Sequence, residues 1–153
     1  MSSRPAFFAA CLLLCCLCTA QAEAVACKTA GGRAAVSQWF GRLNEAWEER
    51  DAAAAAALFS RNASYWDDPF GPPHRGMKAI RTYWDQVSTG QRDVHTSYEV
   101  LSSCGGKSLV HWTARFTRFP SAQKVRLDGI AEIILDRYGK ASSFREWWNR
   151  EQN

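Results

Sequence analysis

Hydrophobic residues recur at three- and four-residue spacing in the first part of the chain, which predicts helices. In the first helix, expected over 34–50, one face is apolar and comprises Val36, Trp39, Phe40, Leu43, Ala46 and Trp47. Asp51 is a good N-cap for a second helix, which we expect over the alanine-rich segment 52–59. A third helix follows Gly76, and its apolar face comprises Ile80, Tyr83, Trp84 and Val87.

Apolar and polar residues alternate in the second half of the chain, which predicts strands. Four strands are expected at 93–102, 107–119, 123–136 and 140–149. The turn-forming residues between them are Cys104-Gly105-Gly106, Pro120-Ser121 and Asp136-Arg137-Tyr138-Gly139. A further short strand, 63–67, precedes the third helix. This order predicts an α+β domain in which three helices pack on one face of a curved, mostly antiparallel sheet.

The N-terminal segment has the organisation of a secretory signal peptide. Arg4 precedes an apolar run at 6–18, and Ala20-Gln21-Ala22 is a cleavage site of the A-x-A type. The run is too short to span a bilayer, although an N-terminal membrane anchor is the alternative. We therefore expect a signal peptide over 1–22, an extension over 23–33, and one domain over 34–150 of a secreted or periplasmic protein.

The cysteines fit export but leave two alternatives open. Four of the six cysteines lie in the signal peptide, and the mature chain keeps Cys27 and Cys104. Two cysteines in an oxidising compartment can form a disulfide. Alternatively, Ala24-Val25-Ala26-Cys27 is a lipidation motif, but it lacks the usual leucine, which disfavours a lipid anchor. Asn62-Ala63-Ser64 matches the N-glycosylation sequon, which matters only in a eukaryotic secretory pathway.

Charge and histidine placement exclude several function classes. The formal charge is only +4, and the basic residues form no run or stripe, so nucleic-acid binding is not expected. His95 and His111 fall on separate strands with no carboxylate at metal-ligand spacing, so we expect no metal site. We also expect no cofactor.

Several short motifs occur along the chain in a definite order. They are Ala46-Trp47-Glu48-Glu49-Arg50-Asp51 before Ala57-Leu58-Phe59, Asn62-Ala63-Ser64-Tyr65, Asp68-Pro69-Phe70-Gly71 with Pro73 and Gly76, Ile80 and Trp84, Leu127-Asp128-Gly129-Ile130, Asp136 to Gly139, and Arg145-Glu146-Trp147-Trp148. In this order they resemble the nuclear transport factor 2-like superfamily, in particular its SnoaL-like and ketosteroid-isomerase-like branches. The resemblance implies a cone-shaped fold that hosts isomerases, cyclases, dehydratases, hydrolases and non-catalytic binders, and that often forms homodimers through the outer sheet face.

The resemblance also implies a general base. In the isomerases an aspartate directly before a Pro-Phe-Gly-like turn has this role, and here that position is Asp68. The isomerases hold the enolate oxygen with a tyrosine and a protonated aspartate, whose positions are here Leu43 and Ala131. Neither side chain donates a hydrogen bond, and losing such donors typically costs ~3 kcal/mol or more each. Steroid isomerase activity is therefore not expected.

Alternation independently predicts which residues face a cavity between sheet and helices. The predicted inward sets are Ser64, Trp66 and Asp68; Trp112, Ala114 and Phe116; Leu127, Gly129, Ala131 and Ile133; and Phe144, Glu146 and Trp148. Two acids, Asp68 and Glu146, intrude on this apolar surface and are the predicted catalytic residues. The predicted ligand-binding residues are Trp66, His74 on the loop rim, Trp84, Trp112, Phe116 and Trp148.

Each of these site predictions has a structural alternative. Asp68 can cap the turn before Pro69, and Glu146 can pair with Arg75 or Arg81. Asp67 is expected to point away from the cavity as turn chemistry. The aromatic residues can belong simply to the core, and His74 to the surface.

Three functions remain open on the sequence alone. The first is an exported domain that binds a small apolar or aromatic molecule in its pocket, with Asp68 and Glu146 orienting the polar end. The second is an enzyme of the isomerase, cyclase or dehydratase type with Asp68 as general base and Glu146 or His74 as its acid partner. The third is a dimeric structural or interaction module. The missing oxyanion donors favour the first.

Overall fold

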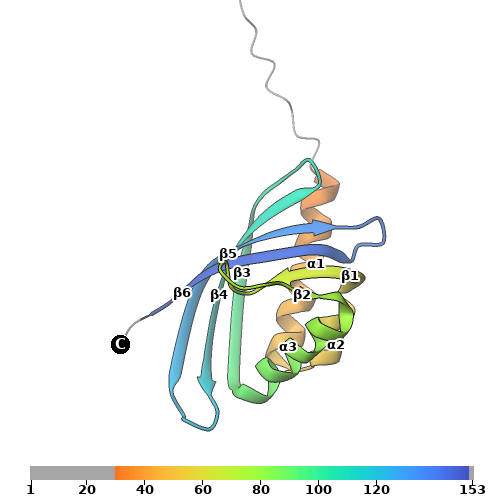
Figure 1. Cartoon of the computed structure of the whole chain (residues 1–153). Helices are drawn as coiled ribbons and strands as arrows, with labels where there is room; N and C mark the ends of the chain where they lie inside the picture. The colour runs from red at the N-terminus through yellow and green to blue at the C-terminus, as the bar shows by residue number, and fades with distance from the viewer. Residues whose placement is uncertain (1–29, 152–153) are drawn as a thin grey trace, which may run out of the picture.

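The computed structural model describes residues 30–151, which form three helices and six strands (Figure 1). In chain order the elements are α1 (Ala30–Glu48), α2 (Ala52–Ala57), β1 (Phe59–Trp66), β2 (His74–Arg75), α3 (Gly76–Gly90), β3 (Gln91–Cys104), β4 (Lys107–Arg118), β5 (Lys124–Leu135) and β6 (Ala141–Arg150). The predicted α+β class is confirmed, and the predicted meander corresponds to β3 to β6.

All six strands belong to one sheet with the order β2-β1-β6-β5-β4-β3. Every neighbouring pair is antiparallel except β1 and β6, which run parallel. The long strands β3 to β6 curve around α1 and α3, so the helices cover the concave face of the sheet (Figure 1). This arrangement leaves space between α1, α3 and the strand ends, where the candidate site lies.

The short helix α2 begins as the sequence predicts but ends earlier. The Asp51 side chain accepts hydrogen bonds from the backbone N–H groups of Ala53 and Ala54, both at 2.9 Å. The expectation that Phe59 belongs to this helix is wrong, because Phe59 begins β1. Its ring is fully buried and stacks on Tyr65 at a centroid distance of 5.6 Å, and this packing outweighs the helical preference of the preceding alanines.

The core is built mainly from aromatic side chains that α1, β1 and β6 bring together. Trp39 is fully buried, and its rings lie 5.4 to 5.6 Å from those of Phe59 and Phe144. The indole N–H of Trp39 donates to the carbonyl of Leu58 at 2.9 Å, so the buried donor is satisfied. This core fixes α1 against the sheet and closes one end of the space beside it.

The face predicted for β1 is wrong. Ala63 and Tyr65 are buried against the helices, whereas Ser64 and Trp66 lie on the other side and are half-buried. Trp66 finds a partner there, since the guanidinium carbon of Arg145 lies 4.4 Å from the centre of its ring. The adjacent aromatics Tyr65 and Trp66 made both phases of the strand look apolar, and tertiary packing chose the phase that buries Tyr65.

Alternation predicted the inward faces of β4, β5 and β6 correctly. On β4, β5 and β6 the buried residues include Trp112, Phe116, Leu127, Ile133, Phe144 and Glu146. Trp148 follows Glu146 on the same face but is 43% exposed, because it lies near the end of its strand. Cys104 is disulfide-bonded, whereas Cys27 lies outside the described residues, so the predicted pairing of these two stays a prediction.

Candidate functional site

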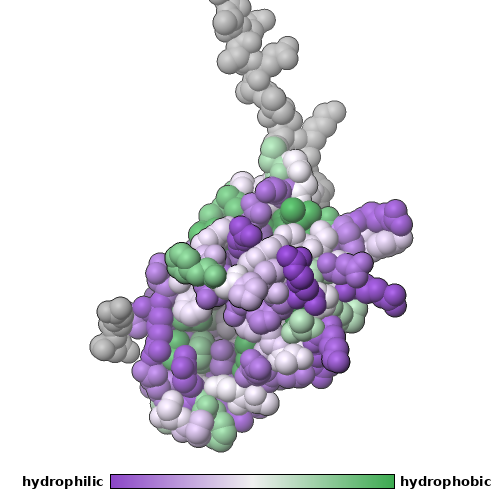
Figure 2. All heavy atoms as spheres, in the orientation of Figure 1, coloured by the Kyte–Doolittle hydropathy of each residue, from purple (hydrophilic) through white to green (hydrophobic). Residues whose placement is uncertain are grey.

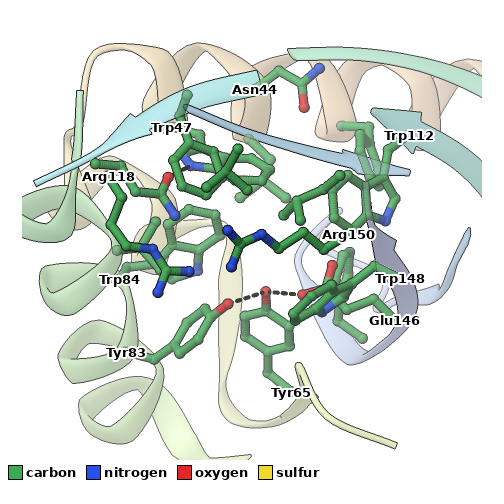
Figure 3. Close-up of a pocket in the computed structure, with 18 residues that line it drawn as sticks. Asn44, Trp47, Tyr65, Tyr83, Trp84, Trp112, Arg118, Glu146, Trp148 and Arg150 are labelled. Carbon is green, nitrogen blue, oxygen red and sulfur yellow. Dashed lines mark hydrogen bonds between the residues drawn. The ribbon is translucent and has the colours of Figure 1, made fainter. Parts of the chain in front are cut away.

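An internal pocket of about 240 Å³ lies between the helices and the concave face of the sheet (Figure 3). We call it the aromatic pocket. Its lining residues are Phe40, Leu43, Asn44, Trp47, Tyr65, Tyr83, Trp84, Val87, Gln91, Trp112, Phe116, Arg118, Val125, Leu127, Phe144, Glu146, Trp148 and Arg150. On the face shown in Figure 2, hydrophobic residues lie in a recess among hydrophilic ones. A concave, mostly apolar space with a few polar groups is the usual form of a small-molecule site.

Three tryptophans from three different elements form the apolar wall. The ring of Trp47 on α1 lies 5.8 Å from that of Trp84 on α3 and 5.8 Å from that of Trp112 on β4, edge to face in both pairs. Trp47 donates its N–H to the side chain of Gln91 at 2.7 Å. The buried N–H groups of Trp84 and Trp112 have no hydrogen-bond partner within residues 30–151. Two donors in this wall are therefore open to an acceptor.

The polar end of the pocket contains one carboxyl group and two phenols (Figure 3). The hydroxyl of Tyr65 donates to Oε1 of Glu146 at 2.7 Å, and the hydroxyl of Tyr83 lies 3.4 Å from that of Tyr65. Glu146 is only 7% exposed. The residue paired with Glu146 on the adjacent strand β5 is Ala131, which adds no polar group.

Burial governs the protonation of this group of three side chains. Loss of solvation raises the pKa of Glu146 to about 8; the hydrogen bond from Tyr65 opposes this rise and the charge of Asp67 adds to it. Burial, followed by the charge of Glu146, raises the pKa of Tyr65 and of Tyr83 well above the usual value. At neutral pH the aromatic pocket therefore contains a mostly neutral carboxylic acid beside two neutral phenols.

Asp67 and His74 extend this polar group toward the surface. Nε2 of His74 lies 3.0 Å from Oδ1 of Asp67, and the imidazole ring lies 4.7 Å from the ring of Tyr83. The N–H of Trp148 donates to the backbone carbonyl of Asp67 at 3.0 Å. The prediction that Asp67 points away as simple turn chemistry is wrong, because the change of face in β1 directs its half-buried carboxylate toward His74.

Asp68 was predicted to face the cavity, but it lies outside the aromatic pocket. It is exposed, lies outside the pocket lining, and accepts a hydrogen bond from the backbone N–H of Phe70 at 2.8 Å. This contact is the turn-capping alternative. The expectation that Asp68 shares the cavity with Glu146 is therefore wrong. The cause is again that β1 turns Tyr65, and not Trp66, toward the helices.

The other predicted site residues divide into two groups. Trp84, Trp112, Phe116, Trp148 and Glu146 line the aromatic pocket, whereas Trp66 and His74 do not. Glu146 does not pair with Arg75 or Arg81, because Arg81 binds Asp85 at 3.0 Å and Arg75 lies near the hydroxyl of Ser64. Glu146 is thus the one predicted catalytic acid that the fold brings into the pocket.

Sequence reasoning missed several lining residues. Tyr65 was missed because the strand phase was wrong, and Tyr83 was assigned only to an apolar helix face. Arg118 and Arg150 continue the inward alternation of β4 and β6, and this signal could have identified them. Leu43, at the position of the isomerases' tyrosine, lines the pocket but cannot donate a hydrogen bond.

The described part of the chain offers no candidate for a metal site or for a membrane-spanning helix. Residues 30–151 contain no group of three or more histidine, cysteine or acidic side chains placed to hold a metal ion. His111 instead contacts Asp128 on the outer side of the sheet at 3.1 Å. Within the same residues, no helix has the length and apolar character required to cross a membrane.

The curved sheet, the helices on its concave face and the aromatic pocket between them define a small α+β pocket domain. The family model of the SnoaL-like domain matches residues 40–144, and the chain belongs to this family. The resemblance to the nuclear transport factor 2-like superfamily is thereby confirmed.

Solved structures support the same fold. SalBIII, an epoxide hydrolase/cyclase-like enzyme with a role in pyran ring formation in the polyether salinomycin, is 22% identical with a TM-score of 0.64, over 76% of this chain and 88% of that chain. A putative isomerase from Bacillus subtilis is 16% identical with a TM-score of 0.68, over 76% and 87%. A search of curated proteins gave no match. Identities this low establish the fold alone.

Proposed function

We propose that this protein binds a small, mostly apolar molecule in the aromatic pocket and orients its polar group at Glu146 and Tyr65. The observation that carries the proposal is the buried Tyr65–Glu146 hydrogen bond of 2.7 Å inside an otherwise aromatic space. The neutral carboxyl group accepts from Tyr65, but its own O–H has no hydrogen-bond partner within residues 30–151, so a ligand with an acceptor oxygen would complete the pair.

The unpaired donors of the wall support the same function. The N–H groups of Trp84 and Trp112 are buried and have no partner within residues 30–151. An apolar molecule with one or two acceptor oxygens would satisfy donors that are otherwise desolvated at a cost of ~1–3 kcal/mol each. We therefore expect ketones, esters or phenols to bind better than hydrocarbons of the same shape.

Acid–base catalysis of the isomerase or cyclase type is the second candidate, and the protonation of Glu146 favours it. A carboxyl group with a pKa of about 8 can donate a proton at neutral pH and accept one after a small change of environment. Tyr65 and Tyr83 would link this proton to the pocket interior. A cyclase-like enzyme and a putative isomerase among the structural neighbours are consistent with such chemistry. In this candidate Glu146, rather than the exposed Asp68, acts on the bound molecule.

A ligand screen tests both candidates. Thermal unfolding would be followed with a set of aromatic ketones, esters and phenols, and each would be paired with its hydrocarbon analogue. We expect ligands with acceptor oxygens to raise the melting temperature, and Tyr65→Phe to reduce that rise. Asp68→Asn is the matched control and should leave it unchanged. Chemical conversion of a bound compound that disappears in Glu146→Gln would establish the enzyme, whereas the absence of stabilisation by every compound would contradict both candidates.

We also propose that the protein is exported after cleavage behind Ala22, with Cys27 free of lipid. The signal-peptide organisation of the sequence supports this proposal. Mass spectrometry of the mature protein would give the mass of residues 23–153, whereas a diacylglyceryl adduct on Cys27 would contradict it.

We further propose that two copies of the chain form a homodimer through the outer face of the sheet. Exposed apolar side chains support it, namely Leu101, Leu109 and Trp147, which lie on β3, β4 and β6. Light scattering after size-exclusion chromatography would give the mass of two chains, and Trp147→Glu would reduce it to one. A single-chain mass for the unmodified protein would contradict the dimer.

A further inference from the structure

We propose that the ligand of the aromatic pocket is a carboxylate anion: an apolar body held among the tryptophans, and a carboxylate held between Arg118 and Arg150. This inference rests on the proposed binding function and specifies its ligand class. It depends on the placement of two arginines that neither the fold nor the core requires.

Both arginines emerge on the concave face of the sheet. On β4 the buried residues Trp112, Ala114 and Phe116 alternate, and Arg118 continues this series. On β6 the series Phe144, Glu146 and Trp148 leads to Arg150 in the same way. Because side chains two apart share a face, both arginine side chains leave the backbone on the pocket side of the sheet.

Both arginine side chains belong to the lining of one pocket. Both line the aromatic pocket, although they lie at the ends of two strands that β5 separates. In Figure 3 the two side chains extend toward each other, between Trp84 and the hydroxyls of Tyr83 and Tyr65. Such a pair can grip the two oxygens of a carboxylate, because a planar guanidinium donates two parallel hydrogen bonds.

Neither guanidinium has a partner in the described part of the chain. Within residues 30–151, no ion pair, side-chain hydrogen bond or ring contact involves the guanidinium of Arg118 or Arg150. Other arginines near the sheet ends are engaged, since Arg92 donates to carbonyls at the end of α3 and Arg126 pairs with Glu151. Arg115, which is exposed like Arg118, also has no side-chain partner within residues 30–151, but Arg115 lies outside this pocket.

The charge of the pocket favours an anion. Its lining has two permanent positive charges, and Glu146 is the one acid among the lining residues. Because the pKa of Glu146 is raised to about 8, its carboxyl group is mostly neutral at pH 7 and does not offset them. A ligand carboxylate would supply the counter-charge that this lining lacks.

Matched pairs of acids and amides test this inference. Phenylacetate with phenylacetamide, and 2-naphthoate with 2-naphthamide, have nearly the same shape within each pair but differ in charge. Their dissociation constants would be measured by isothermal titration calorimetry at pH 7. We expect each acid to bind about tenfold or more tightly than its amide, and the preference to shrink as NaCl is added.

Substitutions then locate the effect. In Arg118→Gln, Arg150→Gln and the double variant we expect the acid to lose its advantage, while the affinity for the amide stays within about twofold of the original. Arg118→Lys should retain part of the preference. Arg115→Gln, on the outer face of the same strand, is the matched control and should change nothing. Far-ultraviolet circular dichroism and the melting temperature would confirm that each variant is folded.

The outcomes separate this inference from the proposed function. If acid and amide bind the unmodified protein equally, the carboxylate inference is overturned and the binding pocket stands. If the acid preference survives in both single variants and in the double variant, the arginines are not its cause and the inference is likewise overturned. If no compound of either pair binds, both the inference and the proposed function fail.

Discussion

The hydroxyl of Tyr65 lies 2.7 Å from Oε1 of Glu146, in a space walled by aromatic rings. The two residues are 81 positions apart, and the parallel pairing of β1 with β6 brings them together. This contact holds the carboxyl group in a fixed direction and limits the rise of its pKa. It is the feature from which the first predictions follow.

Glu146 should make stability depend on pH with a definite sign. The folded protein keeps a proton on Glu146 up to about pH 8, whereas the unfolded chain loses it near pH 4.5. The contribution of Glu146 to stability is therefore complete below pH 4.5 and is lost as pH rises toward 8, by at most ~1.4 kcal/mol per pH unit.

Glu146→Gln should remove this dependence and make the protein relatively more stable above pH 8. Urea unfolding at pH 5, 6, 7, 8 and 9 would measure the difference in the free energy of unfolding from the original protein. Glu49→Gln, at an exposed position, is the control and should give a nearly constant difference. A constant difference for Glu146→Gln as well would contradict the raised pKa.

Tyr65→Phe should raise the pKa of Glu146 further. The hydroxyl donates to the charged carboxylate, so removing it disfavours that form, and the buried acid also loses a partner at a cost of ~1–3 kcal/mol of stability. A carbon-13 NMR titration of glutamate side chains, with Glu146 assigned by its loss in Glu146→Gln, would follow the pKa. Tyr83→Phe is the control with a smaller expected effect, since no hydrogen bond joins Tyr83 to Glu146. A lowered pKa in Tyr65→Phe would refute the assigned hydrogen bond.

Much of this arrangement could be predicted from the sequence, and the wrong positions predicted for Asp67 and Asp68 have one cause. From Val110 onward on β4, and around Phe144 on β6, polar residues separate the apolar ones, so alternation placed Trp112, Phe116 and Glu146 on the correct face. On β1 the adjacent aromatics Tyr65 and Trp66 left the phase ambiguous, and a shift of one residue reverses every side chain. Because of this one-residue error, Asp68 was predicted to face the cavity and Asp67 to point away from it. In the structure Asp67 points toward His74, and Asp68 caps the turn.

Contacts between distant elements were beyond any local pattern. The helical spacing placed Tyr83 on an apolar face, but only the packing of α3 against β1 brings its hydroxyl within 3.4 Å of Tyr65. The capping of α2 by Asp51, in contrast, depends on neighbouring residues and was predicted correctly. Local chemistry thus determined the elements, whereas the polar end of the pocket required the tertiary fold.

Gly129→Ala should destabilise the protein and disturb the pocket wall. A Cβ atom at Gly129 would lie 2.7 Å from the carbonyl oxygen of Trp147 and 2.9 Å from two ring carbons of Trp112. The backbone oxygen cannot move away cheaply, so we expect a loss of ~1–3 kcal/mol in the free energy of unfolding. Gly90→Ala is the control, because a Cβ there meets no atom within 4 Å. Equal stability of the two variants would contradict close packing at Gly129.

Asp67→Asn and Asp68→Asn should differ in their effect on the pKa of Glu146. The charge of Asp67 raises the pKa of Glu146, so Asp67→Asn should lower it, by the same NMR titration. Asp68→Asn removes an equal charge one residue away, but that side chain is exposed and bonded to the turn at Phe70. We therefore expect little change, because water screens a charge at the surface far better than one near the pocket. A larger shift in Asp68→Asn than in Asp67→Asn would show that the strand phase described for β1 is wrong, and with it the position of Tyr65 in the pocket.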